Sequence, residues 1–181
     1  SVDDERAINT LRHCRTEIDK IINSLGGRVF STGGDSVLAE FPSTVNAVRA
    51  SASIQDFLRG FNSDKVEERQ FQYRIGIHVG EVIIDGTDLL GDGVNIAARL
   101  SGVCKPGNVW ISSHGLEFIK KQAEFKFQSE GEHSVKNIPD PIEAYSVINI
   151  WRGQEQKLLK SCRDMFEAHL SESVPKVFQQ V

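Results

Sequence analysis

Two kinds of apolar periodicity alternate along this chain, and their order limits the fold more than any other feature. In some segments apolar side chains recur at helical spacing, and in others they alternate with polar ones as in a half-buried strand. The predicted helices are 1–25, 43–61, a helix that begins near 92, 113–121 and 154–170. The predicted strands are 29–30, 37–41, 71–84 and 108–112, with further strand material at 125–127, 135 and 142–148. Helices mixed with hairpins predict an α+β sandwich, in which helices pack on a mostly antiparallel sheet.

Glycine and proline mark the ends of several predicted elements. Residues 1–4 are typical of a capping box, and Gly26-Gly27 ends the first helix. Pro42-Ser43 opens the second helix. Within 71–84, Gly80 indicates a bulge or a bend. The helix at 154–170 follows the last strand, so we expect one domain over 1–150 and a C-terminal helical extension, a linker or a pairing helix, over 151–181.

Composition and charge exclude several classes of protein. The 181 residues include 39% hydrophobic residues and carry a net charge of −4, so the overall field does not attract polyanions. Basic residues are scattered, and we expect no nucleic-acid partner. No apolar run is long enough to span a bilayer, so we expect no membrane contact from this chain. The cysteines are odd in number and far apart in the chain: Cys14, Cys104 and Cys162. This pattern indicates a reducing compartment, and we expect the protein in the cytoplasm.

Three polar side chains between 88 and 100 have a suggestive spacing. Asn95 and Arg99 are four residues apart, so they share one face of the predicted helix. An amide beside a guanidinium can orient a sugar and hold a phosphate. Asp88 lies on the turn just upstream, and Asp35 lies on a glycine turn between two predicted strands. A carboxylate for a hard metal ion and an Asn/Arg pair for phosphate are the groups that nucleotide chemistry requires. His78 and Glu81 are interpreted as structural, and Asp92 as the cap of the helix that carries Asn95.

These residues lie in blocks that resemble the class III nucleotidyl cyclases, the family of adenylyl and guanylyl cyclase catalytic domains. The resemblance covers about residues 1–148 and follows the family's order. Its blocks are 26–35 (GGRVFSTGGD), 37–41 (VLAEF), 74–82 (RIGIHVGEV), 91–100 (GDGVNIAARL) and a late segment at 135–139 (VKNIP). The resemblance implies a ferredoxin-like α+β domain that works as a head-to-tail homodimer. Each site would then take residues from both chains.

The resemblance also implies a reaction and a role for each residue. In this family the ribose 3′ hydroxyl of ATP or GTP attacks the α-phosphate and pyrophosphate leaves, with two divalent ions, Mg²⁺ or Mn²⁺, at each site. By this resemblance Asp35 is a metal ligand and Asp88 reads the base. Asn95 would orient the ribose, Arg99 would stabilise charge on the α-phosphate in the transition state, and Lys136 would bind phosphate.

The sequence departs from the family at two places. The family's other metal aspartate lies on a strand before the first helix, and we expect that strand to precede Ser1. A degenerate cyclase domain is the alternative. The second departure is Ser31, which stands where adenylyl cyclases have a base-reading lysine. Because Asp88 can accept a hydrogen bond from the exocyclic amine of adenine and would repel the guanine carbonyl, the sequence favours ATP over GTP.

We therefore expect an adenylate cyclase that makes cyclic AMP and pyrophosphate. The alternatives are a guanylate cyclase, or a cyclase-like domain of weak or no activity that binds nucleotide or dimerises to regulate a partner. Gly33-Gly34-Asp35 also resembles the Gly-Gly-Asp-Glu-Phe signature of diguanylate cyclases, but Ser36-Val37 replaces Glu-Phe.

Overall fold

The computed structural model describes residues 2–31, 36–67, 70–85, 88–135, 138 and 140–149. For residues 2–7, 31, 84–85, 88–90 and 149 only the backbone is described. Residues 1–148 form one compact unit. The helix expected at 154–170, and with it the extension at 151–181, lies outside the described residues.

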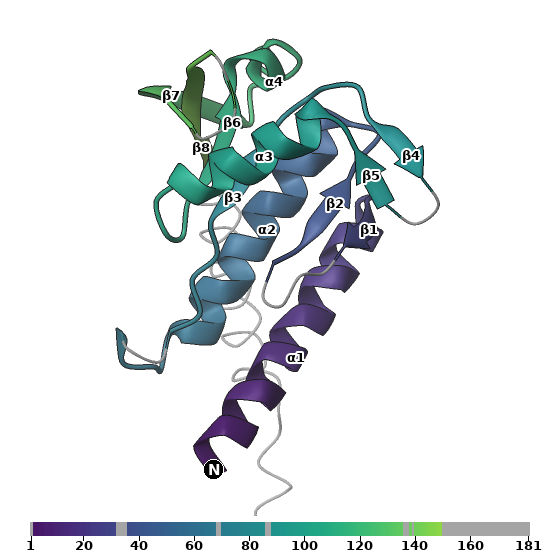
Figure 1. Ribbon diagram of the computed structural model, residues 1–181. Coiled ribbons are helices and arrows are strands. Elements are labelled where there is room, and N and C mark those ends of the chain that lie inside the picture. Colours follow the sequence, from purple (N-terminus) through teal and green to yellow (C-terminus); the bar gives the residue numbers. More distant parts are fainter. Residues whose placement is uncertain are drawn as a thin grey trace, which may run out of the picture. The chain divides into compact units, whose positions relative to one another are not determined.

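Helices and strands alternate along this unit, as the periodicity predicts (Figure 1). In chain order the elements are α1 (Val2–Ser24), β1 (Arg28–Ser31), β2 (Leu38–Glu40), α2 (Thr44–Asn62), β3 (Ile75–Ile77), β4 (Ile83–Asp85), β5 (Asp88–Leu90), α3 (Asp92–Val103), β6 (Val109–Ser112), α4 (Ser113–Glu117), β7 (Phe125–His133) and β8 (Ile142–Asn149). Within the described residues, no helix is both long enough and apolar enough to cross a bilayer.

The strands of the described residues form a four-stranded sheet and two hairpins. The order in the larger sheet is β3-β6-β8-β7, where β3 and β6 are parallel and β6 and β8 are antiparallel. The hairpins β1-β2 and β4-β5 are antiparallel. The prediction of an α+β fold with helices packed on a mostly antiparallel sheet is confirmed.

Strand β6 shows how helices cover both faces of the larger sheet. Side chains of a strand alternate between its two faces, and all four residues of β6 are buried. Val109 and Ile111 pack with Val48 of α2, whereas Trp110 packs with Leu100 of α3. The sheet therefore lies between α2 on one face and α3 on the other, with a core on each side.

The first two helices begin and end close to where the sequence predicts. Ser43 caps α2 through a hydrogen bond of 3.4 Å that its Oγ accepts from the Asn46 N–H. Gly26, whose φ is +77°, follows the end of α1 and takes a conformation that other residues rarely adopt. Ile8 of α1 is 49% exposed. The cluster that joins α1 to α2 begins further along the helix, at Cys14.

The stretch 71–84 does not form one long strand, in contrast to its alternating pattern. Only Ile75–Ile77 pair with β6, and the chain turns before β4 starts at Ile83. Upstream, the Tyr73 carbonyl accepts hydrogen bonds from the Gly107 N–H (2.9 Å) and from Gln55 Nε2 (2.9 Å). Downstream, Gly80 lies close to the start of α3, since a Cβ built on it would lie 3.4 Å from Gly93 Cα. The alternating apolar pattern therefore arises because the short strand β3 packs on both of its faces, and it does not require a long strand.

Candidate functional site

Helix α3 lies directly on strand β3, and one glycine permits this contact. A Cβ built on Gly76 would lie 2.5 Å from the Ala97 carbonyl oxygen and 2.5 Å from the Ser101 nitrogen, both backbone atoms of α3. Any larger residue would therefore push the helix off the strand. The buried face of α3 carries Leu100, which is fully buried against Trp110. The sheet thus fixes the distance of α3 from β3.

Asn95 and Arg99 lie together on the opposite, exposed face of α3. Both side chains are exposed, and neither makes a hydrogen bond or ion pair with another residue that the structure describes. Their spacing of four residues places them one turn apart. The prediction that Asn95 and Arg99 share one face of a helix is confirmed, and their contact with a ligand stays a prediction.

Ser31 and Asp88 come from two strands that contact each other. Ser31 ends β1, and Asp88 begins β5, which lies against β1. The expectation that Asp88 lies on a turn is corrected, because its Cα pairs with that of Asp85 across the β4-β5 hairpin. For both residues only the backbone is described, so the direction of either side chain stays a prediction.

Two predicted ligand residues, Asp35 and Lys136, lie outside the described residues, so their roles stay predictions. Within the ranges described, no group of three or more His, Cys, Asp or Glu side chains could hold a metal ion. The only predicted metal ligand, Asp35, lies outside the described residues, so its part in holding a metal ion stays a prediction.

A cavity of about 390 Å³ lies at the start of α3. Residues from three neighbouring segments line it: the segment after β3, the first turns of α3 and the start of α4. They are His78, Val79, Gly80, Glu81, Ile83, Gly91, Asp92, Gly93, Ile96 and His114. Of these, Ile83 is 68% exposed, and its neighbour in the chain, Val82, is 42% exposed. The cavity is next to the helix turn that carries Asn95.

His78 lies at the centre of this region and is a residue that the sequence interpretation did not place at the site. Its Nδ1 lies 2.8 Å from the Ser112 Oγ, and its ring centroid lies 5.8 Å from that of His114. Burial, and secondarily the nearby His114, hold the pKa of His78 below its usual range. The parallel register of β3 and β6 brings His78 and Ser112 together, because each of them directly follows a residue of the pair Ile77 and Ile111. That pairing could not be read from the sequence.

The prediction that Asp92 caps α3 is wrong. The N-cap residue is Gly91, whose φ of +140° is accessible mainly to glycine, and no side chain caps the helix. Asp92 is instead the first helical residue, where its negative charge is favourable at the positive end of the helix dipole. Gly91 leaves no room for a larger cap, because a Cβ there would lie 3.0 Å from the Glu81 carbonyl oxygen.

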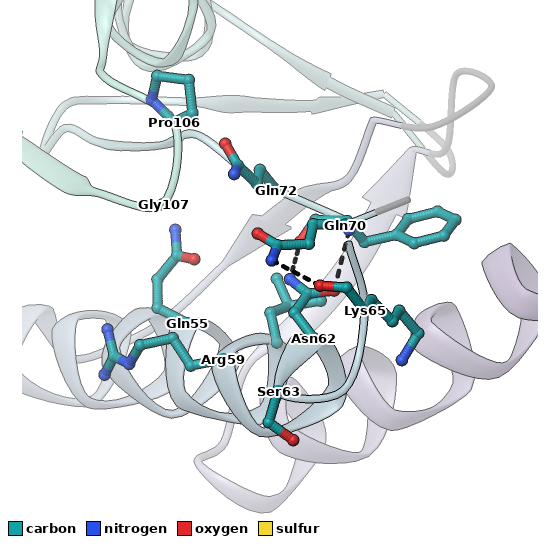
Figure 2. A pocket seen from close by; sticks show the side chains of 11 residues that line it. Gln55, Arg59, Asn62, Ser63, Lys65, Gln70, Gln72, Pro106 and Gly107 are labelled. Atoms are coloured by element: carbon teal, nitrogen blue, oxygen red, sulfur yellow. Dashed lines mark hydrogen bonds between the residues drawn. The ribbon is translucent and has the colours of Figure 1, made fainter. Parts of the chain in front are cut away.

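A second cavity, of about 460 Å³, lies between the end of α2, residues 70–72 and the turn at 106–107 (Figure 2). It contains none of the predicted site residues. Its polar groups bond to the protein itself: Asn62 exchanges two hydrogen bonds with the Phe71 backbone, and Gln70 donates to the Lys65 carbonyl. Its two cations are also engaged, because Arg59 pairs with Asp56 and Lys65 with Asp64. We therefore do not assign a ligand to it.

Comparison with known proteins shows which family this chain is similar to. The family described as "Adenylate and Guanylate cyclase catalytic domain" matches residues 2–149. A protein of Rhizobium meliloti named "Putative adenylate cyclase 3" is 37% identical over 145 residues, which are 79% of this chain and 25% of that protein. The chain spans about a quarter of the length of the curated relatives it matches first, at 25% and 23%.

Two solved structures share the fold. One is described as an adenylate/guanylate cyclase/hydrolase from Silicibacter pomeroyi, with a TM-score of 0.75 and 31% identity over 81% of this chain and 88% of that one. The other is the adenylyl cyclase CyaB from P. aeruginosa, with a TM-score of 0.69 and 21% identity over 82% and 85%. The resemblance read from the sequence is thus confirmed, and residues 2–149 of this chain belong to the family of adenylate and guanylate cyclase catalytic domains.

Proposed function

We propose that this protein is an adenylate cyclase, which converts ATP to cyclic AMP and pyrophosphate. The observation that carries the proposal is the pair Asn95 and Arg99, held on the exposed face of α3 without a protein partner among the described residues. An exposed arginine that has no carboxylate partner is available to a phosphate, and its planar fork matches phosphate oxygens.

Each of the two helix residues has a distinct part in the proposed reaction. The ribose 3′ hydroxyl gives up its proton to solvent and its oxygen attacks the α-phosphorus. The bond from this phosphorus to the bridging oxygen breaks, and pyrophosphate carries away the electron pair. Asn95 orients the ribose, so that the 3′ oxygen lies in line with the leaving group. Arg99 donates hydrogen bonds to the α-phosphate oxygens as negative charge gathers there.

The remaining roles rest on the resemblance of the sequence blocks. Asp88 and Ser31, on the contacting strands β5 and β1, would read the base, and adenine suits an acceptor carboxylate better than guanine does. Lys136 would bind the phosphates. Asp35 would hold Mg²⁺ or Mn²⁺, which when bound neutralises charge on the phosphates. Two ions at each site are expected from the family.

We also propose that the active form is a homodimer built from residues 1–150, with a site shared between the two chains. The apolar side chains of Val82 and Ile83 are exposed beside the cavity at the start of α3. Large exposed apolar side chains next to a site are typical of a surface that a partner covers. The extension at 151–181 would lie outside this catalytic unit.

The test is a product assay on the purified protein. ATP or GTP is supplied with Mg²⁺ or with Mn²⁺, and cyclic AMP, cyclic GMP and pyrophosphate are quantified by mass spectrometry. Cyclic AMP as the main product supports the proposal, whereas cyclic GMP as the main product replaces it with guanylate cyclase. If nucleotide binds and neither product forms with either ion, the protein is a cyclase-like regulatory domain and the proposal is wrong.

A further inference from the structure

Strand β3 and the segment that follows it approach α3 at two places. Gly76 of β3 touches the middle of the helix, at Ala97 and Ser101. After the strand, Gly80 lies close to the first turn of the helix, since a Cβ built on Gly80 would lie 3.4 Å from Gly93 Cα. The His78 ring lies beside this second place: a Cβ built on Gly93 would lie 3.5 Å from His78 Cδ2, and one built on Gly80 would lie 3.2 Å from His78 Nε2. The imidazole therefore packs next to the point where the segment after β3 meets the start of the helix that carries Asn95.

A chain of hydrogen bonds fixes this ring. The Ser112 Oγ accepts a hydrogen bond from the Gly115 N–H (3.2 Å) and shares a second one with His78 Nδ1, 2.8 Å away. The tautomer of the ring sets the direction of the second bond. Ser112 is 2% exposed and caps α4, so it is itself held in place. The ring thus joins the carboxyl ends of β3 and β6 to the start of α3.

The surroundings favour the neutral ring. Burial and His114 of α4 disfavour a positive charge, and the first turn of α3 presents the positive end of its dipole. The carboxylates that line the same cavity, Asp92 of α3 and Glu81 of the segment after β3, act in the opposite sense. Burial and His114 outweigh them, because the pKa of His78 is lowered. The neutral ring is therefore favoured at neutral pH, and the ring takes up a proton at a more acid pH than an ordinary histidine does.

We propose that His78 is a positioning residue for the cyclase reaction, which sets where the first turn of α3 lies and thereby places Asn95 and Arg99. This inference rests on the proposed function, since it assigns these two residues to the reaction. A displacement of reacting groups by about 1 Å can lower a rate by about a hundredfold. A small change at His78 should therefore alter turnover more than it alters nucleotide binding.

The test compares His78→Ala, which removes the ring, with His78→Asn, whose amide can still bond to Ser112 but does not titrate. His13→Asn, at an exposed histidine of α1, is the matched control. We expect His78→Ala to lower kcat by about tenfold or more, with KM for ATP within about threefold. His78→Asn should recover most of this loss. Its kcat should also fall less between pH 7.5 and 5.5 than that of the parent protein or the control.

Two results would overturn the inference: a kcat of His78→Ala within twofold of the parent, or the same loss at acid pH in His78→Asn as in the parent. A parent protein that forms no cyclic nucleotide would contradict the proposed function instead. In that case amide hydrogen exchange at residues 92–96 tests whether His78 positions the first turn of α3. Faster exchange in His78→Ala than in the parent supports the positioning role, and equal rates contradict it.

Discussion

At the scale of single residues, Arg99, to which we assign a role in the reaction, differs in burial from side chains that pack in the core. Arg99 is exposed and has no partner within the described ranges, whereas Cys14 and Cys104 are buried free thiols. A side chain that contributes little to packing can be changed without loss of stability, so its effect on turnover reports on chemistry. Arg99 can therefore be tested without the risk of unfolding the protein.

Arg99→Ala should lower kcat by about 10²–10³-fold, the loss that follows when one preorganised donor to a developing oxyanion is removed. Its melting temperature should stay within about 1 °C of the parent, because exposed positions contribute little to stability. The kcat of Arg99→Lys should lie between those of the parent and Arg99→Ala, since lysine keeps the positive charge and lacks the planar pair of N–H donors of the guanidinium. Arg12→Ala, at an exposed arginine of α1, is the control. An Arg99→Ala protein with the parent's kcat would remove Arg99 from the mechanism.

Cys104 should resist alkylation in the folded protein. It is 3% exposed, and burial, the largest cause, raises the pKa of its thiol to about 11. At pH 7.5 roughly one such thiol in three thousand is ionised, and the thiolate is the reactive form. Peptide mass spectrometry after iodoacetamide treatment should show little label at Cys104 in buffer and full label in denaturant. Rapid labelling in buffer would contradict the burial of this side chain.

At the scale of helices and strands, the sequence predicts where elements lie better than it predicts their lengths. Helical stripes and caps are local, so α1 and α2 could be located from the chain alone. The stretch 71–84 could not, because its alternation does not reveal that β3 pairs only over Ile75–Ile77. Pairing partners are distant in the chain, and a short strand packed on both sides alternates like a long one.

In the candidate site, too, features set by local spacing could be predicted from the sequence, and features set by tertiary contacts could not. Asn95 and Arg99 could be placed on one helix face because a spacing of four is local. His78 could not be connected to them, since its contacts with Ser112 and the first turn of α3 depend on the register of β3 against β6. The capping prediction at Asp92 failed for a related reason. The close approach of the Glu81 carbonyl, which requires Gly91 at the cap, is a tertiary contact.

Two glycine-to-alanine variants test how α3 is held on the sheet. Gly76→Ala would place a Cβ 2.5 Å from backbone atoms of α3, so the helix must move. We expect a loss of about 1–3 kcal/mol in the free energy of unfolding, with a large loss of kcat. Gly102→Ala lies in α3 with nothing within 4 Å of the new Cβ, and should stabilise the protein by up to about 1 kcal/mol. Urea denaturation measures the free energy of unfolding of both variants. A Gly76→Ala protein as stable as the Gly102→Ala protein would contradict the close contact at Gly76.

At the scale of the whole molecule, the question is whether one chain holds a complete site. The described residues of one chain supply the exposed helix face to which we assign the ribose and the phosphate, and they include no group of three or more side chains that could hold a metal ion. The proposed homodimer would join Arg99 of one chain to Asp35 of the other, so two equal sites would form per dimer. Single-chain and shared sites make different predictions for mixtures of two inactive proteins.

Asp35→Asn and Arg99→Ala chains should each be inactive alone and should complement each other when mixed. In a heterodimer one shared site keeps both native residues and the other site loses both, so the heterodimer should have about half of the parent's activity. If the two chains pair at random, about half of the dimers are mixed, and the mixture should show about a quarter. Different affinity tags allow the heterodimer to be purified and assayed directly. A purified heterodimer as inactive as its parents would show that Asp35 and Arg99 do not act at one shared site, and a single-chain site would then replace the proposed one.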